Sequence, residues 1–519
     1  MDTSEKEKLL KIIAEQERTI AELRLIIEQQ ALEIKKLKEI IWGKKSEKSK
    51  KKPKPDKAKP DEASSAKRKR GGGGRKGFPK NIRRKEIRID LSDEEKHCAE
   101  CGKEYEKMGV EISEMLHFIP AILIVLQIIR RRYVKTCACG KCREIALAEM
   151  PVRNIDKGAY STEFIAAALV NKYCDHLPIH RQFRRLLKSS GVSVSESSFC
   201  RWRDTIAEQL TPLAKLMKEK VLRSYCINTD ATTAKYRIPA EHHRLVNGNQ
   251  YVYIGGVDAP YIVWDFQNNQ SSKGIHIFLN GFDKFIQCDA HGNYDALFNP
   301  LVLDLKRPPP VEVGCHAHCR RKFKDIETQE PEIVEVLLSI WRNLYRIEKE
   351  IKYLSVSERL VRRQSESVPL LDQLFDSIRA IQGRNDFLPK SALGLAVAYA
   401  LKNEAALRRY ASDGRLSIDN NVSERTLRGY VIGRKNWLFS GSAQAAKYSS
   451  VILTLLSSAS RHGLNEYEYL VDVLYRLSDL KSLGELEELL PDNWVKSTVP
   501  PTEFAKLVAE AMNPEPVRA

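Results

Sequence analysis

Two aspartates occupy positions from which they could take part in phosphate chemistry. Asp230 follows the apolar run YCINT, and Asp289 follows the apolar run FIQC. Both runs are typical of β-strands, and side chains at strand ends often form sites. If the two strands are neighbours, both carboxylates can share divalent cations such as Mg²⁺ or Mn²⁺, which prefer oxygen ligands. Either aspartate alone would more simply be a turn or helix-cap residue.

Glu424 is the candidate for a third carboxylate. It lies in SIDNNVSERTLRGYVIGRKNWLF, where Asp419 or Asn420 can cap a helix that carries Glu424 in its first turns. The simpler interpretation is a capped surface helix with an ion pair between Glu424 and Arg428. However, the helix is rich in basic and aromatic residues suited to phosphate contact and base stacking, which are Arg428, Arg434, Lys435 and Trp437. Trp437 could equally be a core residue.

Cysteine pairs indicate a second kind of metal site. Cys98 and Cys101 form one C-x-x-C pair, and Cys139 and Cys142 form another within CACGKC. Four thiolates in this pattern favour one tetrahedral Zn²⁺ site, and the apolar segments HFIPAILIVLQII and RRRYVK could form the hairpin of a zinc ribbon. Cys137 could replace Cys139 or Cys142, and buried cysteines without metal are the alternative.

The tight cluster CHAHC does not favour a second zinc site. It places four potential ligands, from Cys315 to Cys319, within five residues, which is poor spacing for one tetrahedral ion. We therefore expect Cys315 and Cys319 to be buried structural residues.

Three helical stretches are expected before the first aspartate, at residues 161–176, 179–190 and 195–222. Gly191 and a short polar turn separate the last two, which is typical of a helix-turn-helix DNA-binding region. In the third stretch, Arg201 and Arg203 lie off the apolar face and are expected to contact DNA. An ordinary helical hairpin with solvated arginines is the alternative.

The N-terminal region predicts self-association. Isoleucine recurs at every seventh residue from Ile13 to Ile41, with leucine or glutamine at the companion positions. This heptad pattern predicts a coiled coil over residues 1–43 and favours a parallel dimer. We expect a homodimer or a higher oligomer, although a single amphipathic helix packed on its own protein would show a related pattern.

The charge of the chain points to a polyanionic partner. Its 519 residues include 86 Lys and Arg against 68 Asp and Glu, a net charge of +18. Much of the excess falls in residues 44–80, which are almost free of apolar side chains and are expected to form a disordered basic linker. DNA is the expected partner.

Export and membrane insertion are not expected. The N-terminal sequence MDTSEKEKLL lacks the apolar core of a secretory signal. The longest apolar run, Phe118–Ile129, contains Pro120 and Gln127 and is shorter than the roughly 20 residues of a spanning helix. We expect a cytoplasmic protein without a membrane partner.

Several motifs occur in a fixed order between about Leu9 and Leu477: IIWGKKSEK, CAECG, NKYCDHLPIHRQ, QCDAHGNY, GCHAHCRRKF and DNNVSERTLRGYVIGRKNWLFSGS. This ordered set resembles the transposases of the insertion sequence sixty-six family, which are bacterial. The last motif is the most specific, because its order of acidic, arginine and aromatic residues is hard to obtain by chance.

The resemblance implies an RNase H-like catalytic domain of the DDE type, with a helical insertion before the glutamate. It implies that Asp230, Asp289 and Glu424 are the catalytic triad, binding Mg²⁺ or Mn²⁺, and that His318 supports the pocket. The implied activity is DNA strand cleavage and strand transfer at the ends of an insertion sequence. Accessory proteins of the same element are implied as further partners.

We therefore expect a multidomain α/β protein. Its parts are a coiled coil (1–43), a basic linker (44–80), a zinc-binding domain (81–155), a helix-turn-helix-like region (156–222), an RNase H-like core (223–318), a helical insertion (319–414), a Glu-bearing helix (415–441) and a C-terminal helical domain (442–519). Five runs after Arg223 predict the strands of a mixed sheet, namely YCINTDAT, QYVYIGGVD, YIVWDF, KFIQCDAHGNY and VEVGC.

Two other functions would use the same acids or the same DNA-binding modules. An RNase H-like nuclease would share the carboxylates but would not need modules for recognising element ends. A transposase-derived regulator would bind DNA without cutting it. Terminal inverted repeats beside the gene would favour transposition, whereas metal-independent binding without cleavage would favour the regulator.

Overall fold

The computed structural model describes residues 159–496 except 269–272, 291, 299–307, 385–386 and 478–481, together with short stretches at 123, 125–129, 132–134, 145–147, 154–155 and 506. The chain divides after Pro120, and every described residue belongs to the unit Ala121–Ala519. The predicted coiled coil, basic linker and candidate zinc ligands lie outside the described residues. Within the described part, no helix has both the length and the apolar character needed to cross a bilayer.

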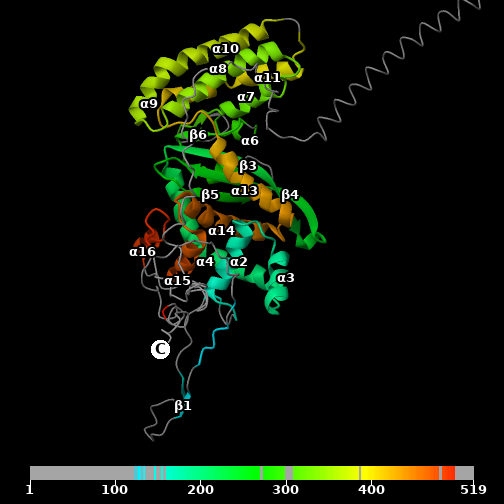
Figure 1. Ribbon diagram of the computed structural model, residues 1–519, viewed down its shortest axis with the longest axis vertical. Helices are drawn as coiled ribbons and strands as arrows, with labels where there is room; N and C mark the ends of the chain where they lie inside the picture. Colours follow the sequence, from blue (N-terminus) through cyan, green and yellow to red (C-terminus); the bar gives the residue numbers. More distant parts are fainter. Residues whose placement is uncertain are drawn as a thin grey trace, which may run out of the picture. The chain divides into compact units, whose positions relative to one another are not determined.

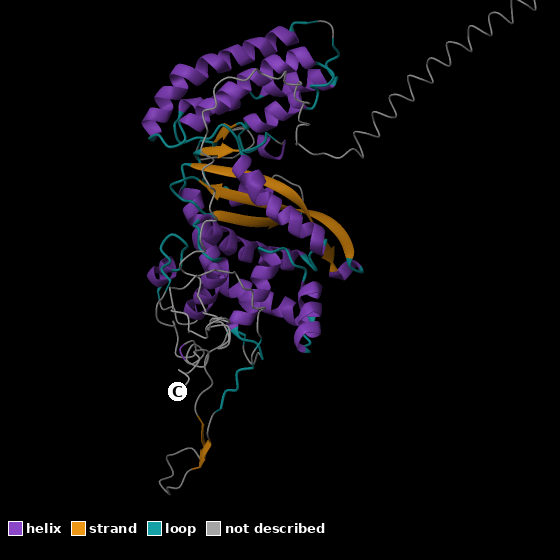
Figure 2. Ribbon diagram, in the orientation of Figure 1, coloured by secondary structure: helices purple, strands orange, loops and turns teal. Residues whose placement is uncertain are grey.

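The five segments predicted as strands each contain one, which confirms the mixed sheet (Figures 1 and 2). They are β3 (Cys226–Ile238), β4 (Arg244–Gly255), β5 (Ile262–Gln267), β6 (Phe285–Gln287) and β7 (Val311–Val313). The strand order is β5-β4-β3-β6-β7. β4 pairs antiparallel with β3 and β5, whereas β6 is parallel to β3 and β7 is parallel to β6.

Three helices precede the sheet, as predicted: α2 (Thr162–Tyr173), α3 (Ile179–Ser190) and α4 (Glu196–Arg223). The hydroxyls of Ser161 and Ser195 cap α2 and α4 by accepting a main-chain hydrogen bond from the first turn. Gly191 ends α3 at a φ of 70°, a left-handed conformation that glycine adopts without strain.

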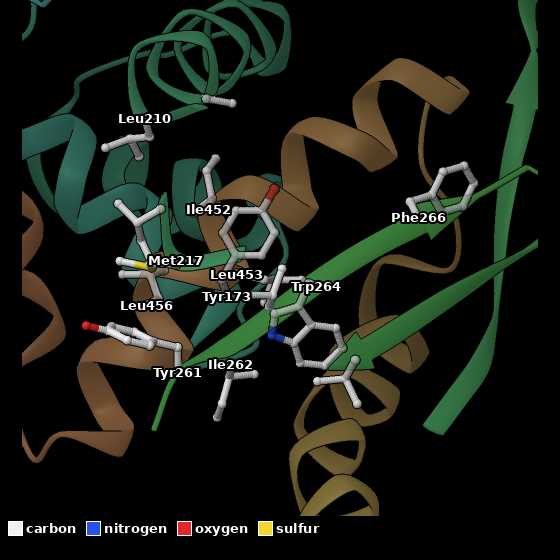
Figure 3. Close-up of a cluster of buried hydrophobic side chains, with 14 of the residues drawn as sticks. Tyr173, Leu210, Met217, Tyr261, Ile262, Trp264, Phe266, Ile452, Leu453 and Leu456 are labelled. Atoms are coloured by element: carbon white, nitrogen blue, oxygen red, sulfur yellow. The ribbon is translucent and has the colours of Figure 1, made fainter. Parts of the chain in front are cut away.

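One hydrophobic core joins α2 and α4 to the sheet and to the C-terminal helices. Figure 3 shows Leu210 and Met217 of α4 near Ile452 of α14 (Ala443–Arg461) and near the strand β5. Leu455 of α14 is wholly buried in this core. The C-terminal helices therefore share a core with the sheet, which differs from the expected separate domain. The other two C-terminal helices are α15 (Glu466–Leu477) and α16 (Leu483–Glu488).

Helix α14 covers the edge strand β5 with hydroxyl side chains. The main-chain N–H groups of Ile262 and Trp264 donate hydrogen bonds of 3.0 Å to the hydroxyls of Ser458 and Thr454. These bonds satisfy donors that an edge strand would otherwise leave unpaired. The edge is thus closed to pairing with another strand.

Helices fill the interval between β7 and the predicted Glu-bearing helix, and they have a hydrophobic core of their own. They are α7 (His316–Lys324), α8 (Pro331–Glu350), α9 (Val356–Arg362), the π-helical turn η2 (Arg363–Ser367), α10 (Val368–Gln382), α11 (Ala392–Lys402), α12 (Glu404–Arg408) and the 3₁₀ turn η3 (Arg409–Ser412). The Glu-bearing helix is α13 (Asn421–Trp437), which packs on β3 and β4.

Buried His316 connects three of these helical segments. Its Nδ1 accepts a hydrogen bond of 3.1 Å from Trp341 Nε1 of α8, and its Nε2 lies 2.9 Å from the carbonyl oxygen of Leu407 of α12. This pairing requires a neutral ring that carries its proton on Nε2. Burial lowers the pKa of His316 to about 4, in agreement with the neutral form.

Short elements complete the described chain. They are β1 (Arg132–Val134), β2 (Ile145–Leu147), η1 (Pro239–Glu241), α5 (Lys273–Phe278) and α6 (Gly292–Asp295). β1 pairs antiparallel with β2. The predicted hairpin instead joined RRRYVK to HFIPAILIVLQII, whose described residues form no strand.

Candidate active site

The register of β3 and β6 brings Asp230 and Asp289 to the same level of the sheet. The two strands are parallel, and their last paired residues are Asn228 and Gln287. Asp230 and Asp289 each lie two residues beyond this pair. Because neighbouring strands are about 4.8 Å apart and side chains alternate between faces, both carboxylates lie on one side of adjacent backbones. The prediction that the two strands are neighbours is confirmed.

Asp230 differs in one respect from its predicted place at a strand end. It lies within β3, opposite Val252 of β4, and β3 continues to Ile238. The strand does not stop at the carboxylate because β4 supplies backbone partners along this length, whereas β6 stops at Gln287. Asp289 does follow a strand end.

A pocket of about 220 Å³ contains both aspartates. Its lining is almost entirely polar and rich in oxygen and amide groups, comprising Asp230, Ala231, Thr232, Thr233, Asn249, Tyr251, Asp289, Asn293 and Tyr294. Oxygen-rich surroundings of this kind suit hard divalent cations rather than soft metals.

The carboxylate of Asp230 is electrostatically perturbed by burial and by neighbouring acids. Burial first, and then the nearby charge of Asp289, raise the pKa of Asp230 to about 7. The main-chain N–H of Ala231 donates a hydrogen bond of 2.7 Å to Asp230 and partly opposes this shift, while Glu424 adds to it. A cation between these acids would relieve their repulsion. All three predicted carboxylates therefore interact electrostatically.

The segment around Asp289 is held by the helical insertion. The hydroxyl of Tyr399 in α11 donates a hydrogen bond of 2.9 Å to the carbonyl oxygen of Asp289. The following residue, Ala290, has a φ of 56°, which is costly for a residue with a Cβ. Such strain persists where surrounding contacts fix the backbone, and it is common at functional sites.

Glu424 is positioned by the residue that precedes α13. The side chain of Asn420, fully buried, donates a hydrogen bond of 2.8 Å to the carbonyl oxygen of Thr229 in β3. Its oxygen accepts hydrogen bonds from Asn228 and Ser423 at 3.0 and 2.9 Å. The start of α13 is thereby fixed to the strand that carries Asp230. Asn420 bridges to the sheet, so it does not cap α13 with its side chain.

Glu424 itself faces α7 and does not line the pocket of the two aspartates. Its Oε2 lies 3.3 Å from Arg321 Nη2, and its Oε1 lies 3.5 Å from His318 Nδ1. Neither Glu424 Oε1 nor His318 Nδ1 has a hydrogen-bond partner among the described residues. His318 is thus next to the third carboxylate, where the resemblance implies a supporting residue.

The three carboxylates do not converge as tightly as ligands of one ion. Within the described ranges, no three His, Cys, Asp or Glu side chains form a group that could hold a metal. The structure thus brings two of the three predicted acids into one pocket and leaves the third nearby, in contact with Arg321 and His318.

Comparison with known proteins identifies the chain. Residues 157–448 match the family model described as "Transposase IS66 family", and residues 95–143 match the model of a "zinc-finger binding domain of transposase IS66". The chain belongs to the IS66 transposase family. The first match covers the sheet, the helical insertion and all three carboxylates, and the second contains Cys98, Cys101, Cys139 and Cys142.

The alignments with similar proteins cover most of this transposase. The uncharacterised protein y4jD of Sinorhizobium fredii is 30% identical over 429 residues, covering 80% of this chain and 81% of y4jD. The uncharacterised protein y4hP of the same organism is 27% identical over 449 residues, covering 82% of this chain and 77% of y4hP. The similarity therefore reaches beyond residues 157–448, which the transposase family model matches.

The two residues of α4 that were expected to contact DNA differ in their exposure to solvent. Arg201 is exposed and donates a hydrogen bond of 3.3 Å to Ser198. Arg203, by contrast, is only 7% exposed and donates to Asp204 at 2.7 Å, so the prediction that it reaches DNA is wrong. Arg203 lies four residues after Phe199, which is buried, and helical periodicity places it on the same face.

The basic and aromatic residues of α13 also have different surroundings. Arg428 and Lys435 are exposed, as contact with a nucleic acid requires. Arg434 donates to the Thr232 hydroxyl at 3.2 Å and to the Thr233 carbonyl oxygen, two residues of the pocket rim. Trp437 is half-buried, with Lys172 of α2 5.4 Å from its ring centre. It is therefore partly a packing residue.

Asn420 and Tyr399 were not predicted as functional residues of the site. In the sequence, Arg321 stands out only as part of the basic motif GCHAHCRRKF, and Asn420 only as a possible helix cap. The sequence does not show which residues these side chains contact, because the contacts join segments about a hundred or more residues apart along the chain. Long-range hydrogen bonds of this kind have no local sequence pattern.

Proposed function

We propose that this IS66 family member is a DDE transposase that cuts and joins DNA strands with Asp230, Asp289 and Glu424. The observation that carries the proposal is the shared register of Asp230 and Asp289 in one pocket. Two carboxylates held close together, with the pKa of Asp230 raised by burial and by Asp289, are typical of sites that bind divalent cations.

The strand order of the sheet supports this assignment, and we propose an RNase H-like fold. Three antiparallel strands followed by two parallel ones place the first and fourth strands of the sheet side by side. This is the neighbour relation that an RNase H-like site needs for its two aspartates. The helices between β7 and α13 fit the insertion expected before the glutamate.

The residues present fit divalent cations. Asp230 and Asp289 would hold Mg²⁺ or Mn²⁺, since both carboxylates line an oxygen-rich pocket and the pKa of Asp230 is raised by burial and by Asp289. Glu424 would complete the set from α13. When bound, such cations make a water nucleophilic near neutral pH and neutralise charge on the phosphate and the leaving oxygen.

The protein groups have separate tasks in this mechanism. Asp230 must lose its proton, which its raised pKa delays until near neutral pH. Arg321 donates a hydrogen bond to Glu424 and orients its carboxylate, with His318 beside it on α7. Arg434, fixed at the rim by Thr232, is placed to contact a phosphate entering the pocket. The same site would first release a 3′ hydroxyl at the element end and then direct that hydroxyl to a target phosphate.

The N-terminal modules would serve end recognition and pairing. Cys98, Cys101, Cys139 and Cys142 supply four thiolates, the ligand set of a structural Zn²⁺ site, with Cys137 as the alternative ligand. The heptad segment 1–43 would pair protomers. Arg201, Arg428, Arg434, Lys435 and Trp437 remain proposed DNA contacts, and accessory proteins of the element are proposed partners in the bacterial cytoplasm.

The proposal is tested by incubating purified protein with its flanking element ends and Mg²⁺ or Mn²⁺. A transposase nicks at the element boundary and joins the new 3′ end to target DNA. A nuclease would cut without joining and without preference for the boundary. A regulator would bind the ends, with or without metal, and leave them intact.

A further inference from the structure

Helix α3 carries an unusual concentration of positive charge. Its sequence, IHRQFRRLLKSS, has four Arg or Lys residues and no acid. Ile179 and Phe183 are buried and Leu186 is partly buried, so these residues attach the helix to the protein and leave its basic face exposed. The four cations all line one surface hollow of about 530 Å³, and they are Arg181, Arg184, Arg185 and Lys188.

These cations have no acidic partner among the described residues, in contrast to exposed arginines such as Arg342 and Arg346. Arg342 pairs with Glu335 at 2.7 Å, and Arg346 pairs with Glu350 at 2.8 Å. On α3, like charges stand three and four residues apart, an arrangement that weakens a helix. The cluster therefore costs the fold some stability, and a bound polyanion would remove that cost.

The spread of the charges favours a polymer over a small anion. From Arg181 to Lys188 the helix rises about 10 Å, at about 1.5 Å per residue. A single phosphate is too small to contact all four side chains. Duplex DNA presents about one charge per 1.7 Å of its axis, so several phosphates can face the helix at once.

The basic helix is connected directly to the helix that carries Glu424. The loop before α3 contacts α13, because Asn436 of α13 donates a hydrogen bond of 3.0 Å to the carbonyl oxygen of His176. Exposed basic residues continue along α13 at Arg425, Arg428 and Lys435. A duplex lying on α3 would thus meet further cations on the helix that leads to the site.

We propose that α3 binds the phosphate backbone of duplex DNA flanking the cleavage site, and that this helix, rather than the N-terminal half of α4, provides the principal contact of the α2–α4 region. The identification of that duplex as element DNA rests on the proposed function. The binding itself does not, since a non-cutting regulator would use the same surface.

The test compares full-length proteins in a metal-free buffer by fluorescence anisotropy with a duplex, over a series of KCl concentrations. In the α3 variant, R181Q/R184Q/R185Q, three cations become neutral side chains of similar length. The matched control, K349Q/K352Q/K390Q, removes three exposed cations from the helical insertion. Thermal melts check both folds, and surface changes of this kind shift stability by only about 0.5 kcal/mol.

Each phosphate contact contributes about 0.9 to the slope of log affinity against log salt concentration. We expect the slope of the α3 variant to fall by about 2 to 3 and its affinity to drop at least about tenfold at the lowest salt, with a smaller change in the control. An unchanged slope, or an equal fall in both variants, would overturn the proposal. Failure of the wild type to cut element ends would refute the transposase mechanism and leave this result intact.

Discussion

The side-chain amide of Asn420 donates a hydrogen bond of 2.8 Å to the carbonyl oxygen of Thr229. This bond joins the residue before α13 to the residue before Asp230, although the two are 191 positions apart. Two of the three proposed catalytic carboxylates are therefore fixed to one another through a buried amide. The geometry of the site depends on a residue that touches neither substrate nor metal.

Replacing Asn420 by Ala should disturb both the fold and the reaction. The variant loses hydrogen bonds to Thr229, Asn228 and Ser423 in a fully buried position, so the free energy of unfolding should fall by about 2 to 4 kcal/mol. Urea denaturation measures this change. Asn421→Ala is the control, because Asn421 is half-buried and bonds locally to Asp419.

Cleavage by the two variants separates positioning from stability. Under conditions where both are folded, Asn420→Ala should cut end DNA at least about tenfold more slowly, while Asn421→Ala should stay near the wild-type rate. Wild-type cleavage by folded Asn420→Ala protein would mean that the bridge stabilises the fold without positioning Glu424.

His316 should make stability fall in mild acid. Burial lowers its pKa to about 4, below the value of about 6.5 in an unfolded chain, so the folded state binds its proton less readily. The neutral ring stabilises the fold fully above pH 6.5, and this contribution is lost as the pH falls from 6.5 towards 4. Over this pH range the free energy of unfolding should fall by about 3 kcal/mol because of His316.

The measurement is the free energy of unfolding of wild type and His316→Gln between pH 7 and 4. The variant should be less stable by about 2 to 4 kcal/mol at pH 7, because Trp341 Nε1 and the Leu407 carbonyl oxygen lose partners, and it should show a flatter pH dependence. Parallel curves for the two proteins would refute the neutral buried ring.

Asp230 should couple metal binding to pH. Its pKa is raised to about 7 in the fold against about 3.8 unfolded, so the folded state binds this proton more tightly. The resulting loss of stability is absent below pH 3.8, grows between pH 3.8 and 7, and is complete above pH 7. A cation that binds the ionised carboxylate should therefore raise the melting temperature more at pH 8 than at pH 6.

Differential scanning fluorimetry with and without MgCl₂ measures this difference. Asp230→Asn should be more stable than the metal-free wild type at pH 8 and should respond less to Mg²⁺. Equal Mg²⁺ shifts at the two pH values, or in the variant and the wild type, would show that Asp230 is not a metal ligand.

The zinc-finger match predicts one Zn²⁺ per chain. Cys101→Ser removes one of four thiolates, so the purified variant should retain less than half of the wild-type zinc and bind element ends more weakly. Elemental analysis measures the metal content, with Cys200→Ser, an exposed cysteine of α4, as the control. Zinc-free wild-type protein would rule out the site.

The strands and the helices before them could be predicted from the sequence because apolar periodicity is a local signal, and the motifs singled out Asp230, Asp289 and Glu424 as candidates. The register that aligns Asp230 with Asp289 could not be predicted, since it depends on how β3 pairs with β6. Contacts of Asn420 and Tyr399 are likewise long-range. Arg203 was assigned wrongly because its charge was given more weight than its place on the buried face of α4.

The exposed basic face of α3, which we propose binds DNA, could not be predicted from the sequence either. The basic character of α3 was visible in HRQFRRLLK, but the sequence did not show that only Ile179 and Phe183 would be buried. Exposure of a whole helix depends on how it packs on its neighbours. The third helical stretch was favoured for DNA contact, whereas much of α4 is occupied in packing against the sheet and α14.

The central claim is that Asp289 is a catalytic carboxylate, and replacing it by Asn tests this most directly. The matched control is Asp265→Asn, because Asp265 is a half-buried carboxylate in β5 of the same sheet and bonds to Gln267 rather than lining the pocket. Cleavage of element-end DNA in Mg²⁺ is measured for both proteins. The account predicts that Asp289→Asn binds DNA normally but cuts about a thousandfold more slowly, a loss of about 4 kcal/mol in transition-state stabilisation, while Asp265→Asn stays near wild type. Near wild-type cleavage by Asp289→Asn, or loss of cleavage in Asp265→Asn alone, would contradict it.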